Sequence, residues 1–404
     1  MTKHRISRRL PTMLVCLTLA ATLGISACSG GATTTAATGS ASAAPDGGGP
    51  AASAPRPAQV AVEPANGARS VSPVDPVKVT VTDGRIGDIT LAKPDGGTVN
   101  GELAADKQSW TATEPLGYGK TYTWHGTATG TDNKPVEISG SFTTVSPNKQ
   151  ISGSLNVGDN QTYGIAIPIA LTFSSKVTDK AAVERRLSVE TTPKTEGSWA
   201  WTSDTSVHWR PKEYYQPGTQ VKVAANIYGV DFGNGAFGKQ DLTADFTIGR
   251  SEIVKGNTQT HHIQVIRDGQ LVADYPVSFG LDSDPGRVTH SGTHVVMGKS
   301  ATYSMCNPKY NYCDVNVPWA VRISNNGEFI HGLASSVWAQ GKKNISHGCV
   351  NLSPERAKEY YDQALIGDPV EIEGSTQQLS PADGDYADWT YSWQDWTKLS
   401  ALNG

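Results

Sequence analysis

The sequence predicts a mainly β protein, and three observations support this fold class. Short segments in which apolar and polar residues alternate recur along the chain, as in "VKVTVT" and "VEISGSFTTV". They are rich in Val and Thr and are separated by Gly, Pro and Asp, a pattern typical of strands joined by turns. Clear start and stop signals of a helix occur at one place, residues 353–367. We therefore expect β-sandwiches and a β-rich domain with one or two helices.

Residues 1–27 have the composition of a secretory signal. A basic head precedes an apolar run over residues 10–25, which is too short and wrongly flanked for a stable membrane span. The signal ends in "ISAC", which resembles a bacterial lipobox, so we expect Cys28 to carry lipid; an ordinary signal peptide is the alternative. Two acyl chains would give a stable anchor. We therefore expect an extracytoplasmic protein of the cell envelope, held at the outer face of the plasma membrane by this lipid only.

Residues 28–59 consist almost entirely of Gly, Ala, Ser, Thr and Pro. Such a segment cannot bury enough apolar surface to offset the entropy cost of ordering it, so we predict a flexible tether. The chain has a net charge of −4, which becomes −8 once the four basic residues of the signal are removed. This balance argues against nucleic acid, or an anionic membrane surface, as a general partner.

Residues 60–148 and 149–250 repeat one pattern. Each range has a Trp, a Pro and a Gly ahead of a strand with Val or Tyr, and their last strands read "GSFTTV" and "ADFTIG". We predict two tandem immunoglobulin-like modules, without the inter-sheet disulfide of antibody domains because neither contains a cysteine. Five tryptophans are expected to fill the cores of these modules rather than to form ligand cages. They are Trp110, Trp124, Trp199, Trp201 and Trp209.

Residues 251–374 keep the β texture, with an Asp-Gly turn between two strands in "HHIQVIRDGQLVADYPVSFG". The one clear helix has Ser353 as its N-cap, Pro354 at its first position and Gly367 at its end. In residues 375–404, three tryptophans stand at helical spacing, a stripe that usually docks on a core. We expect a Trp-rich C-terminal subdomain that braces the domain before it.

The sequence contains five cysteines. Cys16 leaves with the signal, and Cys28 is the expected lipid site. Cys306 and Cys313 stand seven residues apart around an Asn-Pro turn signal, which favours a local disulfide in an exported protein. Cys349, in the stretch "ISHGCVNLS", is left as a single thiol.

A cysteine attacks carbonyl groups as the thiolate, and a thiol with the ordinary pKa of about 8.5 offers little of that form at neutral pH. Cys349 would therefore need a base, for which His347 and His331 are the candidates. A backbone carbonyl could fix the imidazole tautomer, and Gly348 leaves room for substrate and for N–H groups that face an oxyanion. A buried structural cysteine is the alternative. Zinc is a weaker one, because the other histidines lack ligand spacing and no partner cysteine is near.

His331, fourteen intervening residues and then "SHGCVN" at 346–351 resemble the signature of the L,D-transpeptidase (YkuD) family. The resemblance covers residues 252–374, and the order of the segments is similar to that of actinobacterial members. It implies an enzyme that cross-links peptidoglycan between the third residues of two stem peptides and that carbapenems inactivate. It implies neither a metal nor another cofactor.

Carried onto this sequence, the family pattern makes Cys349 the nucleophile and His331 its general base. The main-chain carbonyl of Gly332 would orient His331, at a position where close relatives often carry serine. The backbone N–H groups of Gly348 and Cys349 would help to hold the oxyanion. Four side chains are expected to shape the substrate cleft: Ser346, His347, Asn351 and Met297.

Relatives also hold the oxyanion with a tyrosine on a mobile lid. Here Tyr310 and Tyr312 flank the expected place, although neither aligns cleanly. The Cys306–Cys313 pair would sit in that lid.

The resemblance implies a reaction in two steps. The thiolate of Cys349 attacks the third residue of a donor tetrapeptide stem, D-alanine leaves, and a thioester forms. The side-chain amine of an acceptor stem then resolves the thioester into a 3→3 cross-link, or water resolves it and the enzyme is an L,D-carboxypeptidase. Two other classes stay open: a different cell-wall cysteine hydrolase, and a non-catalytic wall-binding lipoprotein with a degenerate enzyme domain.

Overall fold

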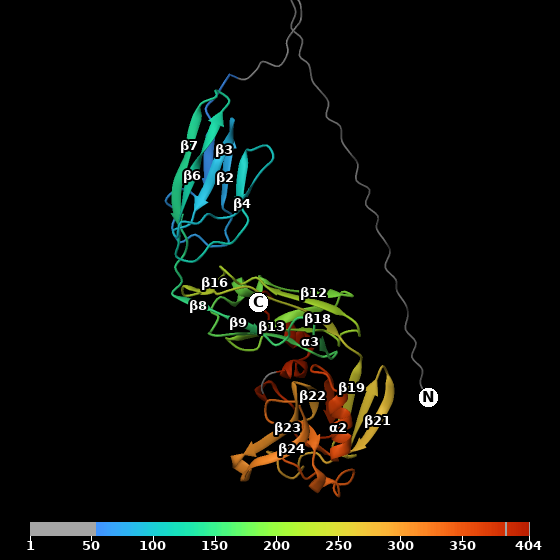
Figure 1. Ribbon diagram of the computed structural model, residues 1–404. Coiled ribbons are helices and arrows are strands. Elements are labelled where there is room, and N and C mark those ends of the chain that lie inside the picture. Colours follow the sequence, from blue (N-terminus) through green and yellow to red (C-terminus); the bar gives the residue numbers. More distant parts are fainter. Residues whose placement is uncertain (1–53, 384–385, 404) are drawn as a thin grey trace, which may run out of the picture. The chain divides into compact units, whose positions relative to one another are not determined.

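The computed structural model describes residues 54–383 and 386–403. The predicted signal, the lipid site Cys28 and nearly all of the predicted tether lie outside the described residues. By its internal contacts the chain divides into a unit of residues 1–54 and a unit of residues 55–404, and the elements named below belong to the second unit. Strands dominate it, which confirms the predicted mainly β fold (Figure 1). Among the described residues, no helix has the length and apolarity that a membrane crossing requires.

The first sandwich consists of two antiparallel sheets. One has the strand order β1 (Gln59–Glu63), β2 (Lys78–Thr82), β5 (Ser109–Ala112) and β4 (Gly101–Leu103), and the other has the order β3 (Gly84–Ala92), β6 (Thr121–Gly130) and β7 (Pro135–Thr143). Trp110 and Trp124 meet edge to face in the core, with their ring centres 5.4 Å apart. Both rings are buried, as predicted.

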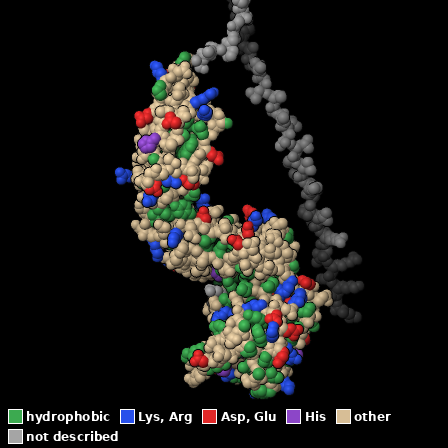
Figure 2. All heavy atoms as spheres, in the orientation of Figure 1, with side chains coloured by type: hydrophobic (Ala, Val, Ile, Leu, Met, Phe, Trp, Pro, Cys, Tyr) green, Lys and Arg blue, Asp and Glu red, His purple; other side chains and the backbone are tan. Residues whose placement is uncertain are grey.

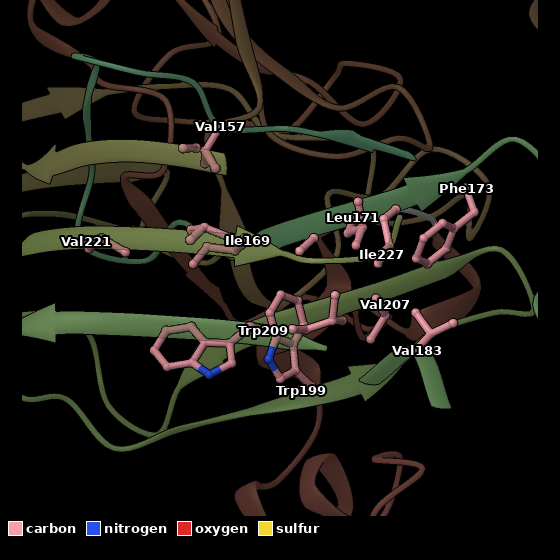
Figure 3. Close-up of a cluster of buried hydrophobic side chains, with 14 of the residues drawn as sticks. Val157, Ile169, Leu171, Phe173, Val183, Trp199, Val207, Trp209, Val221 and Ile227 are labelled. Carbon is pink, nitrogen blue, oxygen red and sulfur yellow. The ribbon is translucent and has the colours of Figure 1, made fainter. Parts of the chain in front are cut away.

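The second sandwich follows directly. One of its two larger sheets has the strand order β10 (Thr162–Tyr163), β18 (Leu242–Ile248), β15 (Gln220–Ala225), β12 (Leu187–Thr192). The other has the order β13 (Gly197–Trp201), β14 (Ser206–Pro211), β11 (Ile169–Phe173), β9 (Gly153–Leu155). A small sheet of β16 (Asp231–Gly233), β17 (Ala236–Gly238) and β8 (Lys149–Ile151) and the short helix α1 (Lys180–Glu184) complete it. Figure 3 shows Trp199 and Trp209 in its core, near Ile169 and Leu171. The predicted core position of these tryptophans is confirmed.

The two sandwiches share one packing arrangement, in which a glycine makes room for the ring of a tryptophan. A Cβ atom at Gly101 would collide with the ring of Trp110, and a Cβ atom at Gly197 would collide with the ring of Trp209. Each glycine therefore lets an indole lie flat against a neighbouring strand, where any side chain would push the ring out of its place.

The last part of the chain contains a five-stranded and a four-stranded sheet. The first has the order β21 (Gln270–Pro276), β20 (His262–Arg267), β19 (Glu252–Asn257), β27 (Pro369–Glu373), β22 (Gly292–Val295), and the second has the order β23 (Gly298–Asn307), β24 (Tyr312–Arg322), β25 (Phe329–Gly332), β26 (Val350–Leu352). Apolar residues of both sheets and of helix α2 (Pro354–Gln363) share one core. Helix α2 packs on β24, β25 and β26.

Helix α2 begins where the sequence predicts and ends earlier. Ser353 is its N-cap, as predicted, and its last residue is Gln363 rather than a residue next to Gly367. Asp368 explains the early end, because its carboxylate accepts the N–H of Leu365 at 2.8 Å, which takes that amide out of the helical ladder.

The C-terminal segment, residues 375–403, docks mainly on the second sandwich. It contains η3 (Pro381–Asp383), η4 (Ala387–Thr390) and α3 (Trp393–Thr397). The guanidinium of Arg210, on β14, lies 4.7, 5.4 and 5.0 Å from the ring centres of Trp389, Trp393 and Trp396. The sequence predicted that this segment braces the domain before it. Its first residues and η4 do so, since the N–H of Leu379 donates to the carbonyl oxygen of Ser291 at 2.7 Å and η4 packs against β22. The indoles collect instead around a cation that belongs to the sandwich.

Charges of both signs are mixed on the surface. Figure 2 shows Lys and Arg side chains interspersed with Asp and Glu over the visible face of the described residues. Pairs such as Lys176 and Asp204, 2.7 Å apart, are solvent-exposed on both sides and contribute little to stability.

We expect Arg210→Ala to destabilise the second sandwich by about 3 kcal/mol, because the substitution removes a buried cation that also donates to the carbonyl oxygens of Asp388 and Tyr391. Chemical denaturation with tryptophan fluorescence measures this loss, and limited proteolysis reports release of the C-terminal segment. Lys212→Ala, which removes an exposed ion pair with Glu196, is the control and should change stability by less than about 0.5 kcal/mol. Equal effects of the two substitutions would contradict the assignment.

Candidate active site

A cleft of about 380 Å³ lies between three segments of the last part of the chain. The first is the long hairpin of β23 and β24, with η1 (Pro308–Tyr310) at its tip (Figure 1). The other two are the segment that begins at His331 and the segment around Cys349. The lining residues are Met305, Tyr310, Tyr312, Val315, Val317, His331, Leu333, Ser335, Ser336, Ile345, Ser346, His347, Cys349 and Asn351.

Strand pairing brings the two predicted chemical groups into this cleft. Strands β25 and β26 run parallel, with His331 paired to Asn351. Paired residues of neighbouring strands share a face of the sheet, and residues two apart along an extended chain point to the same side. Cys349 directly precedes β26, two residues before Asn351. All three side chains therefore face the same cleft, although His331 and Cys349 are eighteen residues apart in the sequence.

His331 is buried, with 4% of its surface exposed. Its Nδ1 lies 3.0 Å from the carbonyl oxygen of Gly332, which is the predicted orienting contact. A carbonyl only accepts, so Nδ1 carries the proton and Nε2 is left with its lone pair. Burial lowers the pKa of His331 to about 4, against the opposing effect of the hydrogen bond to Gly332. His331 is therefore a neutral base at neutral pH.

Cys349 is the free cysteine among the described residues, and its side chain is partly exposed. Its Sγ lies 3.7 Å from the carbonyl oxygen of Gly327 and can donate a proton to it. Burial of the sulfur raises the pKa of the Cys349 thiol to about 12, and the charge of Glu328 adds to this effect. The thiol is therefore protonated in the resting protein.

Glu328 is a buried residue behind Cys349 that sequence reasoning did not place in the site. A Cβ atom built on Gly348 would stand 3.5 Å from Glu328 Cγ, so the carboxylate side chain lies directly behind the cysteine segment. Glu328 Oε1 accepts the backbone N–H of His290 at 2.8 Å and lies 2.9 Å from His290 Nδ1. Only its closeness to His331 in sequence could have drawn attention to it.

Gly348 has φ +114°, a conformation that residues with a side chain rarely adopt. Its N–H donates to Ser346 Oγ at 3.2 Å, and Ser346 Oγ donates to the carbonyl oxygen of Cys349 at 2.5 Å. The amide of Gly348 is thus occupied in this structure, contrary to the expectation that it faces an oxyanion. Ser346 is the reason, because its hydroxyl closes a tight turn around Cys349.

The predicted tyrosines lie at the mouth of the cleft. The rings of Tyr310 and Tyr312 stand 5.1 and 5.2 Å from the ring of His347. Both tyrosines lie in the loop that the disulfide between Cys306 and Cys313 closes. Burial lowers the pKa of His347, with help from a neighbouring positive charge, and burial raises the pKa of Tyr312.

Met297 does not line the cleft, and this expectation was wrong. Its backbone N–H donates to the carbonyl oxygen of Arg322 at 2.9 Å, at the base of the hairpin. Strand β23 then carries the chain toward the tip, so the methionine that reaches the cleft is Met305. The sequence pattern does not show how long the hairpin is, and therefore not which methionine reaches the cleft.

Two further histidines, His261 and His262, take structural partners. His261 Nδ1 lies 2.8 Å from Asn344 Oδ1, and His262 contacts Asp274. Within residues 54–383 and 386–403, no three His, Cys, Asp or Glu side chains come together as a metal ion would require.

Comparisons with known proteins show which family the chain resembles. A model of the L,D-transpeptidase catalytic domain (YkuD) matches residues 251–372, and a bacterial Ig domain model matches residues 68–231. L,D-transpeptidase 5 of Mycobacterium tuberculosis (strain H37Rv) is 44% identical over 98% of this chain and 86% of its own length. L,D-transpeptidase 2 of Mycobacterium tuberculosis (strain CDC 1551) is 35% identical over 82% of each chain.

Among solved structures, the LD transpeptidase LdtMt1 in complex with imipenem is 32% identical, covers 56% of this chain and 100% of its own, and has a TM-score of 0.48. The two longer alignments reach well beyond the catalytic domain, into the sandwiches that precede it. The chain therefore belongs to the L,D-transpeptidase family.

Proposed function

We propose that this transpeptidase forms 3→3 cross-links in peptidoglycan through a thioester on Cys349. One observation supports this above all: the pairing of β25 with β26 puts Cys349 and His331 in one cleft, with His331 Nδ1 held by the Gly332 carbonyl. A neutral imidazole with an unprotonated Nε2, in the same cleft as a thiol, supplies the two groups that acyl transfer through cysteine needs.

In the first step, the donor is a tetrapeptide stem. His331 Nε2 takes the proton of the Cys349 thiol as the sulfur attacks the carbonyl carbon of the third residue. The tetrahedral intermediate collapses, the bond to D-alanine breaks, and His331 returns its proton to the departing amine. Because the thiol has a raised pKa and His331 a lowered one, proton transfer accompanies the attack rather than preceding it.

In the second step, the side-chain amine of an acceptor stem attacks the thioester. His331 accepts a proton from this amine, the carbon–sulfur bond breaks, and His331 passes the proton to the departing sulfur, which restores the thiol. The new amide joins the third residues of two stems. No step requires a metal ion or another cofactor.

Asn351 and the aromatic rim would hold the donor stem. Asn351 is 2% exposed, and its Oδ1 accepts no hydrogen bond among the described residues although it lines the cleft. A buried acceptor without a partner costs free energy, which a backbone N–H of the stem would recover. Ser346 and His347 would bound the same subsite, with Tyr310 and Tyr312 closing it.

A second activity, L,D-carboxypeptidase, is supported by the partial exposure of Cys349. Water that reaches the thioester would release a tripeptide stem instead of a cross-link. The balance between the two products depends on how well the acceptor amine is positioned and water excluded.

The chain would act outside the cytoplasm. Its first 27 residues would direct export, and lipid on Cys28 would anchor it to the outer face of the plasma membrane. The tether that follows would let the catalytic domain reach stem peptides in the wall.

Mixing the full chain with a carbapenem should give one covalent adduct in intact-protein mass spectrometry, because opening of the strained lactam transfers its acyl group to a nucleophile. Cys349→Ala should give none. An adduct that persists in this variant would contradict the assignment of the nucleophile. If the folded wild type gives no adduct, repeating the reaction with a reductant tells an inactive site from a hairpin held shut by Cys306 and Cys313.

The rate of acylation should be nearly constant from about pH 5 to pH 8 and should fall as the pH drops through about 4. The pKa of His331 is lowered to about 4, so the imidazole is neutral above that pH and loses its lone pair below it. Stopped-flow acylation across this range measures the profile. His331→Gln should reduce the rate by roughly 10²–10⁴-fold. A midpoint near 6.5 in the wild type would mean that His331 is solvated.

Glu328→Gln should increase the rate at which iodoacetamide alkylates Cys349 at pH 7, by about threefold to tenfold, because the carboxylate charge raises the pKa of the thiol. Mass spectrometry follows the alkylation. Glu373→Gln, at an exposed position of β27, is the control and should leave the rate unchanged. A slower reaction in the Glu328 variant would overturn the electrostatic role.

A further inference from the structure

Arg287 joins the segment that precedes the nucleophile. Its Nη2 donates to the carbonyl oxygens of Ile345 and Ser346 at 2.8 and 3.1 Å, and its Nε donates to Ser346 at 3.3 Å. These carbonyls stand three and four residues before Cys349. A guanidinium presents its donors in a rigid fork, so two carbonyls gripped by one fork fix the direction of the chain that enters the active-site turn.

The same side chain faces the tip of the β23–β24 hairpin. The guanidinium carbon of Arg287 lies 5.9 Å from the ring centre of Tyr310, within the range of a cation–π contact. A Cβ atom built on Gly286 would collide with the hydroxyl of Tyr310, so this loop lies directly beneath the tyrosine. Tyr310 in turn rests on His347, two residues before the nucleophile.

The charge of Arg287 affects the pKa values of two side chains at the mouth of the cleft, His347 and Tyr312. After burial, it is the next cause that lowers the pKa of His347, and Asp284 opposes it. It also counteracts the rise in the pKa of Tyr312. Arg287 nevertheless is not one of the residues that line the cleft. Any effect on the reaction must therefore pass through Tyr310, His347 and the segment before Cys349.

We propose that Arg287 is a positioning residue that couples the hairpin tip to the cysteine segment. The inference rests on the proposed function, since it concerns how the donor stem is held against Cys349. When the tip closes over a stem peptide, Tyr310 bears on a guanidinium that is already fixed to the two carbonyls. The position of the hairpin tip and the position of Cys349 are therefore coupled. A large acyl donor needs this coupling, whereas a small alkylating reagent does not.

The test compares Arg287→Met, Arg287→Lys and Lys309→Met in the full chain. Lys309 places a second cation 5.2 Å from the centre of the Tyr310 ring, and its substitution leaves the bonds from Arg287 to Ile345 and Ser346 in place, so it is the matched control. The measurements are KM and kcat with a tetrapeptide donor, the rate of acylation by a carbapenem, the rate of alkylation by iodoacetamide, thermal unfolding, and the pKa of His347 by NMR.

For Arg287→Met we expect KM for the donor to rise and the carbapenem rate to fall, each by about tenfold, because misplacement of the reacting groups is costly. Alkylation by iodoacetamide should stay within about twofold, since it needs only the thiol. The pKa of His347 should rise as the cation is lost. Arg287→Lys should restore the pKa of His347 and only part of the rate, because an ammonium lacks the fork. Lys309→Met should behave as the wild type.

Wild-type donor kinetics in a folded Arg287→Met chain would overturn the inference, and so would a parallel fall in alkylation and acylation. Full recovery in Arg287→Lys would reduce the role to charge alone, which also overturns it. Failure of the wild type itself to take up a carbapenem would sink the proposed function instead. The pKa of His347 in the two Arg287 variants would then still show whether the charge of Arg287 acts on the side chains at the mouth of the cleft.

Discussion

The active site depends on one parallel strand pair. Ile330 pairs with Val350 and His331 with Asn351, and this register brings the imidazole and the thiol to the same face of the sheet. A slip by one residue would turn His331 or Cys349 to the other face of the sheet, so the site tolerates no error in register. Buried apolar residues on both strands, Ile330 and Val350 among them, lock the alignment through the shared core.

In the resting site, neither the Cys349 thiol nor the His331 imidazole is charged at neutral pH. The raised pKa of the Cys349 thiol and the lowered pKa of His331 both follow from burial, and both oppose a thiolate–imidazolium pair. Glu328 adds a negative charge behind the sulfur, which further disfavours the thiolate. Such a site does not react readily with small oxidants or electrophiles. Because no ion pair is formed in advance, the reaction rate must depend on the geometry of the site. The site holds a carbonyl carbon where proton transfer and attack can occur together.

The motif was sufficient to single out His331 and Cys349, which lie in a short, specific pattern and which the strand pair brings into one cleft. Positions outside the motif were harder. Met305, and not Met297, reaches the cleft, since the choice depends on the length of a hairpin that the sequence pattern does not measure. Glu328 stands close to His331 in the sequence, but its place behind Cys349 comes from the packing of a turn, which exists only in the folded chain. Tertiary contact, and not local propensity, decided both cases.

Contacts between the second sandwich and the end of α2 support the site from behind. Arg250, in the link between the second sandwich and β19, donates to the carbonyl of Gln363 at the end of α2 and pairs with buried Asp368 at 3.0 Å. Burial raises the pKa of Asp368 to about 6, and the charge of Arg250 opposes that rise. The N–H of Gly164, from the sandwich, donates to the carbonyl of Ile366 in the same loop. Because α2 packs on the strands that carry the reacting groups, these bonds make the sandwich part of the scaffold that holds the site, and not only a spacer.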